Sequence, residues 1–220
     1  MIERPNLNSF PKIKLYDATL RDGQHAVGQK LNQQHYQKYA QLIEECALYA
    51  LEIGHGNGLS ASSYQVGHAE MSDEEMIRAV RPYLKKTLLS TFMLPGWGRC
   101  QDLDMAYDQG VDIIRIATHC TEADVSTRYL EYGARKGLIM QGVLLMSHMA
   151  STQQLVKQAR LMIESGASAV GIYDSAGTYI PEEVSERISA LSHAFDVDIL
   201  FHAHNNLGLA IANSLAALKS

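Results

Sequence analysis

The sequence predicts an α/β fold in which a parallel sheet curls into a TIM-type (β/α)8 barrel that lacks its eighth strand-helix unit. Apolar, β-branched runs alternate with amphipathic helical stretches, which is the rhythm of a parallel sheet covered by helices. Polar residues gather directly after the strands, where such a barrel carries its active site. Seven strand-helix units are present, whereas closure of the barrel requires eight.

Each predicted strand is a short apolar run, and each predicted helix has apolar residues at helical spacing. The strands are expected at Ile13–Leu20, Tyr49–Gly54, Thr87–Leu94, Asp112–Ala117, Met140–Met146, Ala169–Asp174 and Asp198–His202. The helices are expected at Gln33–Ala47, Asp73–Leu84, Gln101–Gln109, Glu122–Lys136, Thr152–Ser165, Pro181–Phe195 and Leu209–Leu218. Ser72 with Glu75 predicts a capping box, and Gly110, Gly137 and Gly166 stand where helices need a C-terminal stop.

No linker or low-complexity segment divides the chain. We therefore expect an N-terminal extension at residues 1–12 and one incomplete catalytic barrel domain at residues 13–220. The formal net charge of -5 provides no basic surface of the kind that nucleic acid or anionic lipid requires. Small-molecule chemistry is favoured over polymer binding.

Three features predict a cytoplasmic protein. The cysteines, Cys46, Cys100 and Cys120, are an odd set without CxxC spacing, and the N-terminal segment has no apolar signal core. No run reaches the roughly 18 apolar residues that a membrane-spanning helix needs.

The first strand runs into a turn, Arg21-Asp22-Gly23-Gln24-His25, that holds a cation, a carboxylate and an imidazole. Asp22 has the chemistry to bind a hard metal, Arg21 to hold a developing oxyanion and His25 to move protons. The alternative is a surface turn in which Arg21 and Asp22 merely pair.

His202 and His204 stand at the end of the last strand. Residues two apart in a strand face the same side, so both imidazoles can point at one ion. In a barrel the first and seventh strands lie close together, which brings Asp22 to the same place. Two imidazoles and one carboxylate form a set that leaves coordination positions open for substrate and water.

Other polar groups follow the remaining strands. Ser175, in Asp174-Ser175-Ala176-Gly177, could bind a substrate carboxylate, although a helix-capping Asp-Ser turn explains the same residues. The loops that carry His55, His119 and His148 have either a direct role or a purely local one. Neither a nucleotide-binding glycine motif nor a GxSxG elbow occurs, so metal chemistry is favoured over nucleotide binding and over a hydrolase triad.

Six motifs together resemble the 4-hydroxy-2-oxovalerate aldolase family, from about Leu15 to Ala217. They are TLRDGxH after the first strand, HGNGL after the second, ATHCTEADVS after the fourth, MSHM after the fifth, DSAG after the sixth and HAHNN after the seventh. RDG and HxH alone would indicate only the wider superfamily that includes 3-hydroxy-3-methylglutaryl-CoA lyase and isopropylmalate synthase.

The resemblance implies a divalent-metal-dependent retro-aldol cleavage of 4-hydroxy-2-oxopentanoate to pyruvate and acetaldehyde, in the catabolism of aromatic hydrocarbons. Asp22, His202 and His204 would bind the metal, Mn²⁺ as a rule, with Co²⁺ or Mg²⁺ as other candidates. Arg21 would stabilise the pyruvate enolate, His25 would be the base and Ser175 would contact the substrate carboxylate. Arg21, Asp22, Ser175 and His202 would thus border the substrate.

The sequence departs from the family in two ways. Asn57 and Asn205 replace residues that are often Asp and His in relatives. Relatives also continue through an eighth strand into a C-terminal helical domain, which supplies a Tyr to the site and docks an acylating acetaldehyde dehydrogenase. None of this follows Ser220, so we expect an open barrel that forms homo-oligomers or aggregates. A related acyl-CoA lyase or synthase and a non-catalytic fragment stay open as alternatives.

Overall fold

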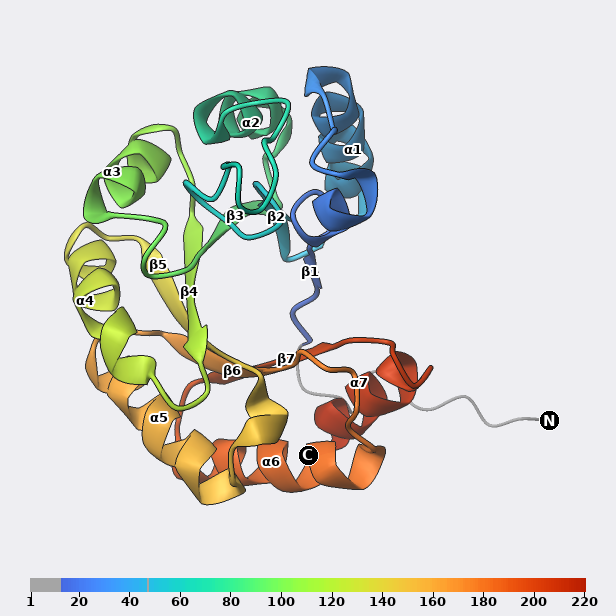
Figure 1. The fold of residues 1–220 in the computed structure, drawn as a ribbon, viewed down its shortest axis with the longest axis vertical. Helices are drawn as coiled ribbons and strands as arrows, with labels where there is room; N and C mark the ends of the chain where they lie inside the picture. Colours follow the sequence, from blue (N-terminus) through green and yellow to red (C-terminus); the bar gives the residue numbers. More distant parts are fainter. Residues whose placement is uncertain (1–12, 47) are drawn as a thin grey trace.

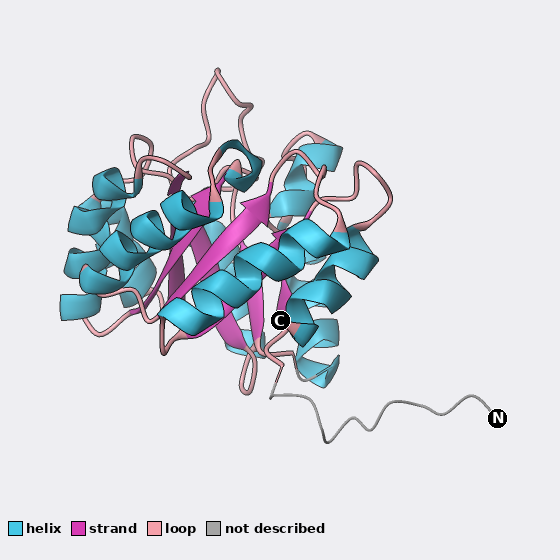
Figure 2. Cartoon of the chain, turned by 90° about the horizontal axis from the view of Figure 1, so that it is seen from below, coloured by secondary structure: helices cyan, strands magenta, loops and turns pink. Residues whose placement is uncertain are grey.

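The computed structural model describes residues 13–46 and 48–220. Its sheet has seven strands in the order β1 to β7, and every neighbouring pair is parallel. The sheet curls, and the helices lie on its outer side (Figures 1 and 2). The prediction of an incomplete (β/α) barrel is confirmed for the described part of the chain, whereas the predicted extension at residues 1–12 lies outside it.

The elements alternate as predicted. The strands are β1 Tyr16–Asp17, β2 Ala50–Ile53, β3 Leu88–Met93, β4 Ile113–His119, β5 Ile139–Leu145, β6 Ala169–Asp174 and β7 Asp198–Ala203. The α-helices are α1 Gln33–Cys46, α2 Asp73–Val80, α3 Cys100–Asp108, α4 Thr127–Arg135, α5 Thr152–Glu164, α6 Pro181–Ala194 and α7 Ala210–Lys219. The predicted helix end at Ala47 lies outside the described residues. The capping box of Ser72 and Glu75 is present, and the three predicted stop glycines have positive φ.

The first predicted strand was too long. β1 ends at Asp17 because the Asp17 carboxylate accepts the Thr19 N–H (3.0 Å) and the Ala18 carbonyl accepts the N–H groups of Arg21 and Asp22. The chain then enters a 3-10 helix, Asp22–Val27, that sequence patterning did not reveal. The helix expected at Glu122–Lys136 likewise begins with a 3-10 turn, Ala123–Ser126.

Two apolar regions lie on the two sides of the sheet. The larger one fills the space between the strands and the outer helices. The smaller one is inside the curl and consists of Phe92, Ala117, Val143 and Tyr173. Charged and polar side chains share this interior, and Glu52, Arg115 and Gln141 are all buried there. The barrel interior is therefore partly polar, and it places charges directly beneath the carboxyl ends of the strands.

The strands β1 and β7 do not pair with each other in the described chain. A cavity of about 510 Å³ opens between them, with Leu15 and Tyr16 on one side and Ile199 and Phe201 on the other. The Lys14 ammonium forms an ion pair with the Asp198 carboxylate across this opening. The sheet thus keeps β1 near β7 although backbone hydrogen bonds do not join them.

Candidate metal centre

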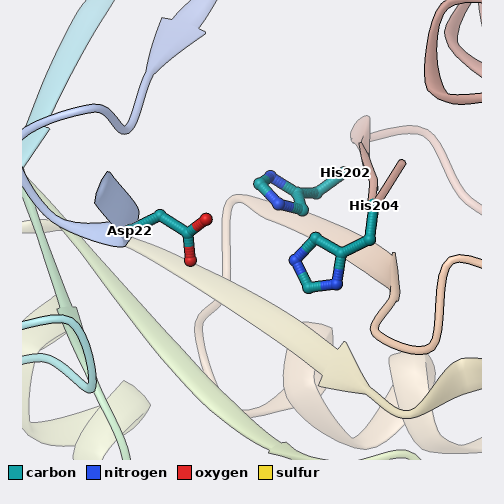
Figure 3. A group of neighbouring side chains, drawn as sticks. All are labelled: Asp22, His202 and His204. Atoms are coloured by element: carbon teal, nitrogen blue, oxygen red, sulfur yellow. The ribbon is translucent and has the colours of Figure 1, made fainter. Parts of the chain in front are cut away.

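The turn after β1 and the end of β7 bring three predicted ligands together. One ligand atom from each of Asp22, His202 and His204 can be chosen so that all three lie within 4.8 Å of one another. Figure 3 shows the carboxylate facing the two imidazoles. The carboxylate and two nitrogens suit a divalent ion such as Zn²⁺, Mn²⁺ or Fe²⁺, and they leave room for further ligands. The donor set therefore fits a metal.

The orientation of His204 is set by a hydrogen bond. Its Nδ1 lies 2.8 Å from the Ser175 carbonyl oxygen, which makes Nδ1–H the donor and leaves Nε2 as the nitrogen available to a metal. Ser175 follows β6, so the sixth strand supports a ligand that the seventh strand presents. Sequence reasoning placed Ser175 in the site but not in this role.

His202 is suited to ligation by its electrostatic surroundings. Burial, the neighbouring His204 and the Arg21 guanidinium together lower the pKa of His202 to about 4. The imidazole is therefore neutral at pH 7, which is the form that a metal binds.

Arg21 is buried beneath the candidate ligands. Its Nε donates to Glu52 at 2.9 Å, and its Nη1 donates to Asp22 at 2.8 Å and to the Gly56 carbonyl at 3.3 Å. Its Nη2 is also buried and has no hydrogen-bond partner among the described residues. A buried donor without a partner is costly, so this nitrogen suits an oxygen of a bound anion. The simple alternative, an exposed Arg21–Asp22 pair, is excluded because Arg21 is only 5% exposed.

Glu52 joins Arg21 to a second buried arginine. Its carboxylate is fully buried and lies 3.3 Å from Arg115 Nη1 as well as 2.9 Å from Arg21 Nε. Complete burial raises the pKa of Glu52, but the Arg115 and Arg21 guanidinium groups outweigh burial and bring the pKa below its ordinary value near 4.5. Glu52 therefore stays ionised and holds both guanidinium groups in place.

His25 lies on the exposed side of the same turn and packs over Gly56. A Cβ atom on Gly56 would come within 2.6 Å of the His25 ring, so only glycine lets the imidazole rest there. The Gly56 carbonyl also accepts the hydrogen bond from Arg21. The loop after β2 thus supports both functional groups of the turn after β1.

The other candidate loops differ in the local contacts that their polar groups make. The Asp174 carboxylate accepts the N–H groups of Thr178 and Tyr179 within the loop after β6, so it does not cap α6, whose N-cap residue is Ile180. His55 is fully buried between the Gly67 carbonyl and the Asn57 N–H. His119 Nδ1 lies 2.8 Å from Thr121 Oγ1. The His148 ring has a buried Nδ1 without a partner among the described residues.

The two departures from the family pattern differ in their surroundings. The Asn205 side chain accepts the Ala210 N–H at the start of α7. Asn57 contributes its backbone N–H to His55. Neither side chain belongs to the carboxylate and imidazole group of Figure 3.

Comparison with known proteins identifies a family. The family model described as HMGL-like matches residues 12–220. A 4-hydroxy-2-oxovalerate aldolase of Serratia proteamaculans is 50% identical over 208 residues, 94% of this chain and 62% of the relative. A protein of the same name from Streptomyces tendae is 45% identical, over 94% of this chain and 58% of the relative. The chain thus spans about three fifths of the length of these curated relatives.

Solved structures show a similar fold. The carboxyl transferase domain of Rhizobium etli pyruvate carboxylase, with oxamate and biotin, superimposes with a TM-score of 0.81. The superposition covers 96% of this chain and 39% of the chain of known structure, at 18% sequence identity, so the likeness concerns the fold alone.

Among the described helices, none combines the length and the apolar character needed to cross a bilayer.

Replacing His202 with Ala removes one of three candidate ligands. We expect Mn²⁺ affinity to fall by more than the 10–100-fold that loss of an outer hydrogen-bond partner costs. Elemental analysis after dialysis and Mn²⁺ titration followed by electron paramagnetic resonance measure the loss. His119→Ala is the matched control, since His119 is the last residue of β4, at the same end of the barrel, but is not one of the three. Equal Mn²⁺ content in His202→Ala and the unmodified chain would show that the assignment is wrong.

Replacing Glu52 with Gln should destabilise the fold by roughly 3–5 kcal/mol at pH 7, because two buried guanidinium groups lose their counter-ion. In the folded protein the pKa of Glu52 lies below its ordinary value of about 4.5. Its stabilising contribution is therefore full above pH 4.5 and declines as the pH falls through the lower folded pKa. Urea unfolding at several pH values should show the difference between the two proteins shrinking below pH 4.5. A difference independent of pH would contradict an ionised Glu52.

Proposed function

This chain belongs to the HMGL-like family, and we propose that it carries the catalytic barrel of a divalent-metal-dependent aldolase that cleaves 4-hydroxy-2-oxopentanoate to pyruvate and acetaldehyde. The observation that carries the proposal is the cluster of Asp22, His202 and His204 beside Arg21, which donates to Asp22 and whose Nη2 has no hydrogen-bond partner among the described residues. The names of the similar proteins support the reaction. The substrate is a small 2-keto acid, which suits a site at the mouth of a barrel.

A bound divalent ion, Mn²⁺ first among the candidates and Co²⁺ or Mg²⁺ after it, supplies a Lewis acid for the keto and carboxylate oxygens of a 2-keto acid. Asp22, His202 and His204 would hold that ion. Because these three side chains leave coordination positions open, Asp22 and His202 also border the substrate.

Arg21 acts on the charge that develops in the reaction. When the C3–C4 bond of the substrate breaks, its electron pair passes into the enolate of pyruvate and acetaldehyde leaves. The buried Nη2 of Arg21 has no hydrogen-bond partner among the described residues, so it is the nitrogen left to donate to the enolate oxygen, whereas the other nitrogens are held by Glu52, Asp22 and Gly56. A donor fixed in advance lowers the barrier because it needs no reorganisation.

His25 and Ser175 complete the proposed chemistry. His25 accepts the proton of the 4-hydroxyl as the C3–C4 bond breaks, and the enolate then takes a proton at C3 from solvent while His25 returns its proton to solvent. The Ser175 hydroxyl oxygen accepts the Met146 N–H at 2.9 Å, which leaves its own hydrogen for the substrate carboxylate. Each of these groups lies after a different strand, as in other barrels.

Pyruvate release tests the proposal. With Mn²⁺ and 4-hydroxy-2-oxopentanoate, a coupled lactate dehydrogenase assay should detect pyruvate. Arg21→Lys should lower kcat by roughly 100-fold or more and leave Mn²⁺ affinity nearly unchanged, because lysine keeps the charge but loses the planar fork. Normal turnover by Arg21→Lys would refute the role of Arg21.

The assay also separates the alternatives. A version of the chain extended through an eighth strand is run in parallel, since the chain spans about three fifths of its relatives. If neither version releases pyruvate with Mn²⁺, the aldolase proposal is wrong. Cleavage of an acyl-CoA instead would favour the related lyase or synthase.

We further predict that the chain associates with itself. Leu207, Ile211 and Leu215 are exposed at spacings of four residues on and before α7, and Ile211 is 77% exposed. Apolar side chains in such a row favour contact with another surface. Ile211→Glu should lower the apparent mass in light scattering with size-exclusion chromatography, whereas Tyr64→Glu, at a position 98% exposed elsewhere, should not. A monomer at every concentration would contradict this prediction.

Binding of an acylating acetaldehyde dehydrogenase, which the resemblance implies for full-length relatives, also stays a prediction.

A further inference from the structure

The two histidines of the candidate metal centre are held in different ways. The His204 ring is fixed by a hydrogen bond from Nδ1 to the Ser175 carbonyl. For the His202 ring, the described residues provide no hydrogen bond to either nitrogen. A metal-binding imidazole normally has its second nitrogen held by a neighbouring acceptor, so His202 needs another source of orientation.

Tyr173 lies against the ring of His202. The two ring centroids are 4.5 Å apart and the ring planes differ by 21°, so the rings are stacked. Tyr173 in β6 and His202 in β7 are direct partners in the parallel register of the two strands. Stacking of this kind is favourable and fixes the plane of the smaller ring. The backbone register therefore sets the contact.

Tyr173 is itself held firmly. Its hydroxyl accepts a hydrogen bond from Arg115 Nη1 at 2.9 Å, and its ring stacks with Phe92 at a centroid distance of 6.3 Å. Arg115 is fixed in turn by Glu52, by a hydrogen bond to Gln141 and by the face of Tyr16, 4.0 Å from its Cζ. Because Tyr173 is only 4% exposed, its ring is poorly able to adopt another orientation.

We propose that Tyr173 is a positioning residue that orients His202 for metal binding by stacking, with Arg115 holding the tyrosine hydroxyl. This inference rests on the proposed function, since it assigns a support to one of the proposed ligands. The ring and the hydroxyl of Tyr173 have different parts in this support. The ring touches the ligand, whereas the hydroxyl acts only through the ring.

Two variants separate these parts. Tyr173→Leu removes the ring, and Mn²⁺ affinity should fall about 10-fold or more, the loss typical of a missing outer support. Tyr173→Phe keeps the ring, and affinity should stay close to that of the unmodified chain. The matched control is Tyr179→Leu, because Tyr179 is 1% exposed and has one hydroxyl hydrogen bond to Ser147, yet it does not stack on a candidate ligand. Equal affinity in Tyr173→Leu and Tyr179→Leu would overturn the proposal.

Nuclear magnetic resonance of histidine-labelled protein tests the stacking of Tyr173 on His202 directly. It needs no metal, and it needs no variant that could fail to fold because a buried ring is missing. The ring protons of His202, assigned with His202→Ala, should be shifted upfield by Tyr173 in the unmodified chain and in Tyr173→Phe. No upfield shift in the unmodified chain overturns the positioning role. If the shift is present but the chain binds no Mn²⁺, the stack stands and the proposed metal function fails. If Mn²⁺ binds and Tyr173→Leu binds it equally well, the metal function stands and the positioning role fails.

Discussion

The interior of this barrel depends on the ion pairs that the buried Glu52 carboxylate forms with two arginines. This carboxylate is fully buried and contacts the guanidinium groups of both Arg21 and Arg115. Removing three charges from water is expensive, and their attraction offsets the cost only when the geometry is good. Glu52 meets this condition because strand β2 places it between the turn after β1 and strand β4. Arg21 cannot leave the site without uncovering this charge.

The same carboxylate connects the strands that carry the chemistry. Glu52, Arg115 and Tyr173 come from β2, β4 and β6, and alternate strands of a TIM barrel contribute the side chains of one interior layer. Within this layer Arg115 donates a hydrogen bond to the Tyr173 hydroxyl, and the Tyr173 ring stacks on His202. A charged layer beneath the mouth thus contacts both Arg21, the proposed enolate-binding residue, and, through Tyr173, the candidate metal ligand His202. Large apolar side chains would fill the same space but would leave these groups free to rotate.

Sequence reasoning located the mouth of the barrel but not its support. The grouping of Asp22, His202 and His204 was predictable because polar residues at the ends of apolar strands meet at one end of the barrel fold. Glu52 and Arg115 are single charges inside apolar strands, and their partners are tens of residues distant in the chain, so no local pattern connects them. The available signal was their residue type, since an ionisable side chain in a buried strand needs a partner. The short β1 was missed because side chain to backbone hydrogen bonds of Asp17 ended it where the apolar run continued.

Charge balance links this interior to the class of ligand at the mouth. Arg21 and Arg115 contribute +2, and Glu52 and Asp22 contribute -2, so the described group is neutral when the two ligand imidazoles are neutral. A divalent ion at the candidate site would bring the sum to +2, above a partly desolvated interior where charges interact strongly. A monoanion such as a 2-keto acid lowers that sum, whereas a neutral aldehyde or alcohol leaves it unchanged. The Nη2 of Arg21, which has no hydrogen-bond partner among the described residues, is left to donate a hydrogen bond to that anion. The charges beneath the site therefore support the proposed carboxylate-bearing substrate for a reason that is independent of the resemblance to known aldolases.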